Sequence, residues 1–341
     1  MKILITGATG FVGGHFLRYF ASIYGAENVH GTGRSKAKVE ILKAEGFTLL
    51  CGDLLDLNFV SSELTSYDVY VHCAAKSSIW GTYDSFHSAN VLATQNLLAS
   101  VPANSQFIYL SSANMYFKYS DRISIREDDE LCLTSFYSKT KRDAELLVLN
   151  LPNISSTVLR ARAIVGIGDT VVFPRVIRAY KEGRLRIIGS GNNTIDFTSI
   201  NNLCLAVYLS IKNRASASGQ VYNISNGDTI VLWEEIKNIL VKLGYTPKLK
   251  TVPYPLAYLV ARFKELKTSL KDNEPAMTCY GVAVLNYSMS LDISKAKTEL
   301  GYKPVENSSQ TLTDFIRSVR MNPKELEINT HNQVPRLYKK A

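Results

Sequence analysis

Short apolar runs alternate with segments whose apolar residues recur every three or four positions through the first half of this chain. The runs have the length and composition of buried strands: KILIT (2–6), NVHGTG (28–33), FTLLCGD (47–53), DVYVHCAA (68–75), QFIYLSS (106–112) and STVLRAR (156–162). The segments between them have helical spacing. This alternation predicts an α/β protein with a doubly wound parallel sheet, covered by helices on both faces.

The pattern loosens after about residue 165 and then partly returns. An apolar helix over about 200–212 and a strand QVYNIS (220–225) resume the first pattern, and the rest from about residue 229 is mainly helical. We therefore predict a sheet domain formed by 1–165 with about 199–228. A smaller, mainly helical substrate domain is predicted for about 166–198 with 229–325, followed by a loose tail over 326–341.

Composition narrows the class of protein. The chain has 341 residues, of which 46% are hydrophobic, so a large core is expected. Its first apolar run is too short for a secretory signal, which predicts a cytoplasmic protein. The five cysteines form no CxxC pair, which favours buried thiols over disulfides or zinc ligands, and we expect no metal.

The formal net charge of +9 indicates an anionic partner of some kind. Basic residues are scattered rather than gathered in a stripe, so we do not expect nucleic acid to be that partner. The apolar stretch VPYPLAYLVARF (252–263) is shorter than the ~20 residues of a membrane-spanning helix, and prolines and Arg262 interrupt it. It could touch a membrane surface or line an apolar pocket together with Met277, although core packing is the commoner cause of such spacing.

Three glycines follow the first strand and precede an amphipathic helix. Gly7 would allow a tight turn, Gly10 a close approach of a ligand to the main chain, and Gly13 the packing of helix on strand. Main-chain N–H groups and the helix N-terminus together favour a pyrophosphate. In this context the spacing predicts a Rossmann-type dinucleotide site, with a structural turn that binds nothing as the alternative.

The end of the second strand bears on which dinucleotide binds. An acid there would bind the adenosine ribose of NAD, whereas an arginine accommodates the 2′-phosphate of NADP. This chain has Arg34, followed by Ser35 as a further donor. NADP(H) is therefore favoured, and NAD(H) is the alternative if Arg34 belongs only to a solvated turn. Asp53, after the third strand, could accept from the adenine amino group or cap the next helix.

A second group of polar residues points to chemistry. Tyr137 and Lys141 lie four apart on a predicted helix, hence on one face. Ser111 and Ser112 end a strand at the carboxyl edge of the sheet, where open α/β folds bind ligands. Lys141 would lower the pKa of Tyr137 toward working pH. Tyr137 would then pass a proton to or from a carbonyl oxygen, and Ser112 would hydrogen-bond that oxygen.

These motifs, in this order, carry a family resemblance over nearly the whole chain: TGATGFVG, GDLLD, VHCAA, NVLATQNLL, YLSSANMY, YSKTK, LRARAIVGIGD and DFTSINNL. The chain resembles the extended short-chain dehydrogenases/reductases. The resemblance implies a catalytic set of Ser112, Tyr137 and Lys141, with Lys141 also holding the nicotinamide ribose. It implies a homodimer through helices over 90–100 and 137–150. The implied cofactor-binding residues are Gly7, Thr9, Gly10, Phe11, Val12, Gly13, Arg34, Ser35, Asp53, Leu54, Ala74, Ala75, Lys76, Asn90, Tyr137, Lys141, Ala163 and Val165.

Within that family, residues 274–304 are similar to the 3β-hydroxysteroid dehydrogenase group and to its bacterial relatives that reduce 2-alkyl-3-oxoalkanoic acids with NADPH. Ile195 stands where nucleotide-sugar epimerases and dehydratases usually carry Arg, and Ala113 and Asn114 replace the acid that follows the catalytic hydroxyl in dehydratases. Ala161 takes the place of the usual proline after Arg160.

The sequence therefore predicts an NADP(H)-dependent oxidoreductase that interconverts a ketone and a secondary alcohol on a largely apolar small molecule, 3-oxoacyl or steroid-like. One alternative is a nucleotide-sugar epimerase with tightly bound NAD. The other is a non-catalytic dinucleotide-sensing protein, which would have no need of the Tyr137 proton donor.

Overall fold

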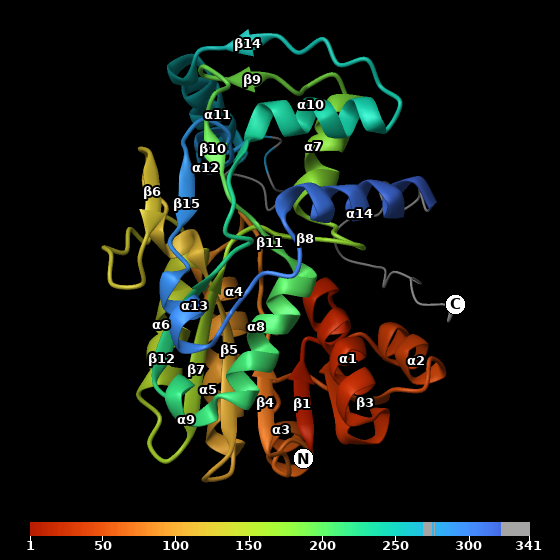
Figure 1. Ribbon diagram of the computed structural model, residues 1–341. Coiled ribbons are helices and arrows are strands. Elements are labelled where there is room, and N and C mark those ends of the chain that lie inside the picture. The colour runs from red at the N-terminus through yellow and green to blue at the C-terminus, as the bar shows by residue number, and fades with distance from the viewer. Residues whose placement is uncertain (269–274, 276, 322–341) are drawn as a thin grey trace.

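The computed structural model describes residues 1–268, 275 and 277–321. The tail predicted for 326–341 lies outside the described residues. Figure 1 shows the large sheet with its helices in the lower half of the molecule and a set of shorter elements above it.

One parallel sheet of seven strands organises the lower half. Its strand order is β12-β7-β5-β4-β1-β2-β3, so the order reverses between β1 and β4. Every neighbouring pair runs parallel. The predicted fold class is confirmed, and each of the seven strands coincides with a predicted run: β1 (Ile3–Thr6), β2 (Val29–Gly33), β3 (Thr48–Cys51), β4 (Val69–His72), β5 (Gln106–Ser112), β7 (Ser155–Ala161) and β12 (Gln220–Ile224).

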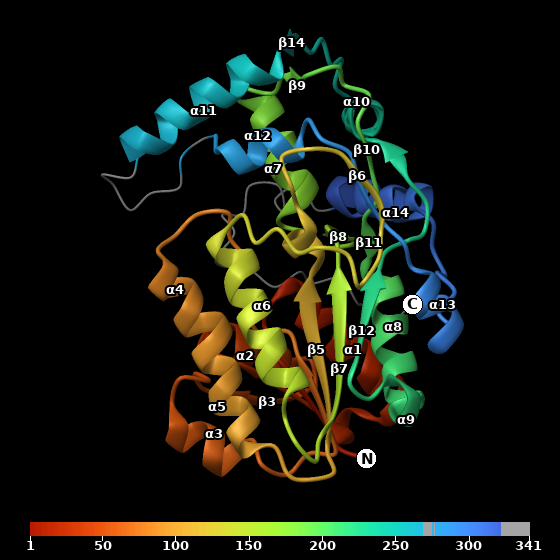
Figure 2. The same cartoon turned by 90° about the vertical axis from the view of Figure 1, so that its left-hand side faces the viewer.

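Helices cover both faces of this sheet. On one face α1 (Phe11–Tyr24), α2 (Lys36–Ala44) and α8 (Ile200–Lys212) pack their apolar sides into the largest core cluster. On the other face α3 (Leu57–Glu63), α5 (Ala93–Ser100) and α6 (Phe136–Leu149) enclose a separate cluster. Figure 2 shows α5 and α6 side by side in front of the strands. Shorter helical elements connect them: η1 (Ala26–Asn28), α4 (Tyr83–His87), the π-helical η2 (Ser88–Leu92), η3 (Ala113–Tyr116) and α9 (Arg214–Ala217).

The upper half is built from helices and very short strands around a core of its own. Trp233 is buried in this core and donates its indole N–H to the Leu285 carbonyl at 3.0 Å. Its helices are α7 (Val172–Lys181), α10 (Leu232–Lys242), α11 (Tyr254–Thr268), α12 (Cys279–Val284) and α14 (Ser308–Met321), while α13 (Ser294–Glu299) packs below against β12.

Three small sheets accompany the main one. The four-stranded one has the order β13-β10-β15-β6, and two pairs are β11-β8 and β14-β9. Sequence patterning did not reveal these strands, because two to four residues are too few to display alternation. Their bounds are β6 (Arg122–Ile125), β8 (Ile164–Val165), β9 (Ile187–Ile188), β10 (Thr194–Ile195), β11 (Thr198–Ser199), β13 (Ile230–Val231), β14 (Thr251–Val252) and β15 (Met289–Leu291).

Two expectations about apolar positions need correction. Helix α11 is not a core helix, because only Ala257 and Ala261 are buried and its larger apolar side chains face outward. Met277 packs against the upper core. All five cysteines are free thiols, but only Cys204 and Cys279 are buried; Cys73 and Cys132 are half-buried, and Cys51 is exposed because it ends the edge strand β3. Within 1–268 and 277–321, no helix is long and apolar enough to cross a membrane.

Candidate active site

The loop between β1 and α1 has the geometry that its glycines require. Gly7 adopts φ +69°, which favours glycine, and the Gly10 N–H donates to the Gly7 carbonyl at 2.9 Å. A Cβ atom at Gly13 would lie 2.3 Å from the Gly7 carbonyl oxygen, so no larger residue fits there. The loop also touches the segment after β4, since a Cβ at Gly7 would be 2.9 Å from the Ala74 Cα.

The N-terminus of α1 suits an anion. Its N-cap is Gly10, which supplies no side-chain cap, and the first turn contains no acid. The first N–H groups of the helix are therefore open to a ligand at its positive end. This end lies at the reversal of strand order between β1 and β4, where dinucleotides bind in such sheets. The residues present thus fit the pyrophosphate of a dinucleotide.

The predicted adenosine end gathers at the ends of β2 and β3. Arg34 Nη1 lies 3.6 Å from Asp53 Oδ2, and both side chains are well exposed. Ser35 serves as the N-cap of α2, with its hydroxyl accepting from the Lys38 N–H at 3.5 Å. Asp53 does not cap α3; Asp56 does so, because its carboxylate accepts from the first N–H groups of that helix. That alternative role for Asp53 is therefore wrong.

The segment after β4 is held by Asn90. Its Oδ1 accepts from the Lys76 N–H at 2.7 Å, and its Nδ2 donates to Thr140 on α6 at 3.1 Å. Asn90 lies in η2, a π-helical turn, a distortion that is frequent at functional sites. One buried amide thus ties the predicted cofactor loop (Ala74, Ala75 and Lys76) to the helix that carries Tyr137.

The proposed catalytic residues meet at the end of β5. Ser112 is the last residue of that strand, and Tyr137 is the second residue of α6. A capping box between Ser135 and Ser138 fixes the start of this helix. The hydroxyls of Ser112 and Ser77 lie close enough to the Tyr137 phenol to lower its pKa. Sequence reasoning missed Ser77; its one signal was its place just after β4, at the same sheet edge.

Lys141 is buried one turn further along α6. Its Nζ donates to the Leu110 carbonyl at 2.7 Å and lies 4.0 Å from the centroid of the Tyr109 ring. Burial lowers the pKa of Lys141 to about 7, although the nearby carboxylate of Glu145 opposes this shift. Because this pKa is close to neutral pH, the protonation of Lys141 is sensitive to any charge that enters the site.

The expected lowering of the Tyr137 pKa by Lys141 is not found. Burial raises the pKa of Tyr137 above its ordinary value, and the two serine hydroxyls only partly oppose this effect. The physical reason is that Lys141 donates to the main chain of β5, so that the groups that lower the pKa of the phenol are the Ser112 and Ser77 hydroxyls alone. In this arrangement Tyr137 stays protonated near neutral pH and is a proton donor.

Beneath the catalytic helix lies a buried ion pair. Glu145 accepts from Arg160 Nη2 at 2.6 Å and from the Ser111 hydroxyl at 2.8 Å. Burial would raise the pKa of Glu145, but these bonds and the charge of Arg160 hold it below its ordinary value. Arg142 adds a third contact at 2.5 Å. The network fixes α6 to β5 and β7, and no feature of the sequence pattern had indicated it.

The segment that follows β7 carries local strain. Ala163 has φ +40°, a conformation that residues with a side chain rarely adopt. Val165, in β8, is fully buried in the upper core. Arg162, just before Ala163, is buried and pairs with Asp196 at 3.0 Å. The Asp196 carboxylate also accepts from the Leu291 N–H. The strained residue is thus held by a buried ion pair on one side and by the core on the other.

Aromatic side chains from distant parts of the chain form a cluster that reaches Tyr137 through Tyr280. Tyr280 of α12 packs edge-to-face on Phe117 at 5.0 Å, and Tyr119 does the same on Tyr258 of α11 at 6.1 Å. Tyr280 lies close enough to both Tyr137 and Arg162 for their charges to affect its pKa. We call Phe117, Tyr119, Tyr258 and Tyr280 the aromatic roof. It joins the segment after Ser112 to the upper half.

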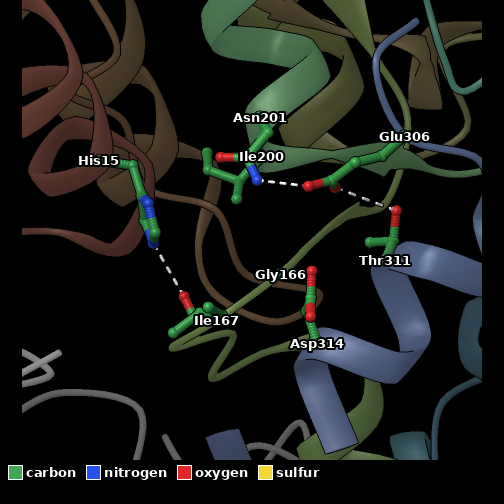
Figure 3. A pocket seen from close by; sticks show the side chains of 8 residues that line it. All are labelled: His15, Gly166, Ile167, Ile200, Asn201, Glu306, Thr311 and Asp314. Carbon is green, nitrogen blue, oxygen red and sulfur yellow. Dashed lines mark hydrogen bonds between the residues drawn. The ribbon is translucent and has the colours of Figure 1, made fainter. Parts of the chain in front are cut away.

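A small hollow lies elsewhere, between α1, α8 and α14 (Figure 3). His15 bonds to the Ile167 carbonyl at 2.8 Å on one side, and Asn201 donates to Glu306 at 2.5 Å on the other. Its volume of about 20 Å³ holds a single water at most. We interpret it as a packing feature, because it could not admit a substrate.

Comparison with known proteins places this site in a family. The model of the NAD dependent epimerase/dehydratase family matches residues 3–225. The chain is 30% identical to a 2-alkyl-3-oxoalkanoate reductase of Stenotrophomonas maltophilia, over 89% of this chain and 95% of that protein. It is 29% identical to a 3β-hydroxysteroid-dehydrogenase/decarboxylase of Arabidopsis thaliana, over 85% and 71% respectively.

A solved structure shows the same fold. The UDP-glucuronic acid 4-epimerase of Bacillus cereus in complex with NAD superposes with a TM-score of 0.70, at 23% identity, over 94% of this chain and 99% of that one. This chain belongs to the NAD dependent epimerase/dehydratase family, the extended short-chain dehydrogenases/reductases. It is an oxidoreductase that uses a nicotinamide dinucleotide on keto or hydroxy groups. The predicted resemblance is confirmed.

Proposed function

We propose that this enzyme reduces a ketone to a secondary alcohol with NADPH, on a largely apolar substrate of 3-oxoacyl or steroid-like type. The observation that carries the proposal is the buried, protonated Tyr137 at the end of β5, with the hydroxyls of Ser112 and Ser77 close to it and Tyr280 of the aromatic roof nearby. The relatives named as an oxoalkanoate reductase and a hydroxysteroid dehydrogenase support this substrate class.

The side chains have distinct tasks in this reaction. When bound, the dinucleotide supplies a hydride to the carbonyl carbon. Tyr137 donates its phenolic proton to the carbonyl oxygen, and Ser112 donates a hydrogen bond to that oxygen as negative charge develops there. Ser77 holds the phenol in place. Lys141 contributes positive charge below the site and a donor for the ribose, and the aromatic roof offers apolar surface to the substrate.

The preference for NADPH rests on the end of β2. Arg34 follows directly after Gly33, the last residue of β2, and no acid occupies the position that would bind the ribose of NAD. Helix α2 begins two residues after Arg34, so its N-terminus lies beside that side chain's position in the chain. A 2′-phosphate would compete with Asp53 for the guanidinium, because a dianion binds Arg more strongly than an exposed carboxylate 3.6 Å away. NAD(H) remains the alternative.

Assembly and location complete the proposal. Leu92, Phe136 and Leu146 expose 38, 51 and 40% of their surface on η2 and α6, which supports a homodimer through these helices. Sedimentation equilibrium should give twice the chain mass, and Leu146→Glu should halve it.

Free thiols at all five cysteines are consistent with the cytoplasm. We retain the proposed division into sheet and substrate domains.

The test is oxidation of NADPH by the purified protein with 3-oxo acids, 3-ketosteroids and UDP-hexoses, with NADH in parallel. Turnover of an apolar ketone should fall at least about 100-fold in Tyr137→Phe, since proton transfer contributes that much. Tyr24→Phe is the matched control, because its buried hydroxyl makes no hydrogen bond in the described part of the chain.

Two outcomes would contradict the proposal. Epimerisation of a UDP-hexose without net use of cofactor would favour the nucleotide-sugar alternative. Tight NADPH binding without turnover of any carbonyl compound would favour a sensing protein.

A further inference from the structure

Helix α11 turns a row of large apolar side chains to solvent. Leu256, Leu259, Val260 and Phe263 expose 54, 52, 40 and 64% of their surface. Their spacing of three, four and seven residues places them on one face. The buried residues of the helix are Ala257 and Ala261, which pack against the upper core. The exposed face therefore has no counterpart in the core.

Positive charge borders this apolar face. Arg262, Lys264 and Lys267 are exposed on the same helix. Glu265 is the one acid among residues 254–268 and is largely covered. Its Oε1 accepts from the Cys279 N–H at 2.8 Å, and its Oε2 lies 3.9 Å from Arg262 Nη1, whose side chain stays well exposed. Lys248 and Lys250 are exposed on the segment that leads through β14 into the helix. The outward surface of α11 thus carries both apolar side chains and cations.

The position of α11 also matters. Figures 1 and 2 both place it with β14 at the end of the molecule opposite the N-terminus. Its inner side contributes Tyr258 to the aromatic roof. One helix therefore contributes to the aromatic roof on its inner side and presents apolar residues outward.

We propose that α11 docks on the surface of an anionic lipid bilayer, with Leu256, Leu259, Val260 and Phe263 below the headgroups and the flanking cations among them. The charge favours this occupant, because acidic headgroups complement Arg262, Lys264 and Lys267. A second copy of the chain is the weaker candidate. Four half-exposed side chains offer roughly 400 Å², about half of the roughly 800 Å² per partner of a stable interface.

Sedimentation of the full chain with vesicles tests this docking. The protein should bind vesicles of phosphatidylglycerol and phosphatidylcholine about tenfold or more tightly than pure phosphatidylcholine, and high salt should weaken the binding. Phe263→Ser should weaken it about tenfold. Val305→Ser is the matched control, since Val305 is 61% exposed in the loop before α14.

Three results would overturn the inference. The wild-type protein could stay in the supernatant with every vesicle, or Phe263→Ser could bind as tightly as Val305→Ser. Without lipid, Phe263→Ser could lower the oligomeric mass, which would assign the surface to a second copy. The docking does not depend on the proposed reaction: ketone turnover in lipid-free buffer should be the same in wild type and Phe263→Ser, so either proposal can fail alone.

Discussion

Arg34 stands at the end of β2 with most of its side chain exposed and a single loose ion pair to Asp53. Such a pair contributes little to stability, at most about 1 kcal/mol. The residue is therefore free to exchange Asp53 for a phosphate at small cost. Its role is best tested by binding, because its loss should leave the fold intact.

We expect Arg34→Ser to raise the KM for NADPH about tenfold or more and to leave the KM for NADH nearly unchanged, since a charge-assisted bond to phosphate contributes roughly 1.5–3 kcal/mol. Initial rates with both cofactors measure this. Arg126→Ser is a close control, because Arg126 is equally exposed and also lies 3.6 Å from a carboxylate. Equal loss with both cofactors would contradict a phosphate contact.

Some site residues could not be predicted from sequence. Tyr137 and Lys141 share a helix face, and Ser112 ends a strand, so spacing alone was informative. Ser77 and Tyr280 have no such relation to Tyr137 along the chain, because β4 and α12 reach it only through the folded topology. The predicted lowering of the Tyr137 pKa by Lys141 was not found for a similar reason. The Lys141 ammonium donates to the Leu110 carbonyl, and this contact depends on the three-dimensional fold.

At the scale of elements, α6 is the most constrained helix of the site. A capping box fixes its start, Asn90 contacts it through Thr140, and Glu145 anchors its underside to Arg160. Both proposed catalytic side chains lie between these fixed points. The helix therefore holds Tyr137 and Lys141 rigidly, which keeps the cost of ordering them low during reaction.

Glu145→Gln should lower the free energy of unfolding by about 3 kcal/mol, because it leaves the buried Arg160 without a counter-charge. It should also lower the pKa of Lys141 below about 7, since Glu145 now raises it. Urea unfolding and the pH dependence of turnover measure the two effects. Glu130→Gln, at an exposed ion pair with Lys118, should change neither. A loss of stability with an unmoved pH profile would make Glu145 purely structural.

Elements differed in how well sequence revealed them. Strands of the main sheet are buried on both faces and so form continuous apolar runs. The two-residue strands of the upper half leave no such pattern. Helix α11 has apolar spacing like that of a core helix, and only the small Ala257 and Ala261 show which side packs. Spacing identifies a face but not what covers it.

For the whole molecule, buried histidines set the response to acid. Burial lowers the pKa of His15 to about 4 and that of His72 to about 3, whereas an unfolded histidine titrates near ~6.5. Both are therefore neutral when folded. The stability they contribute is present above about pH 6.5 and is lost as the pH falls toward 4.

When the pH falls from 7 to 5, each histidine should lower the free energy of unfolding by about 2 kcal/mol. Asp169 acts in the opposite sense, because burial raises its pKa to about 6, and it should offset roughly 1 kcal/mol. Urea unfolding at the two pH values should show a net loss of about 2–3 kcal/mol. His15→Gln, whose amide can still donate to Ile167, should lose about 2 kcal/mol less. An equal loss in both proteins would exclude His15 as a contributor.

The outermost strand β12 pairs with β7 but is supplied by residues 220–224, after the chain has left the sheet to build β9, β10 and α7. During synthesis the other six strands are therefore complete before β12 is made, and the β7 edge stays unpaired until then. Until residue 224 leaves the ribosome, that edge can pair with other chains. A polypeptide that ended before β12 would thus be a substrate for chaperones and proteases rather than a smaller working enzyme.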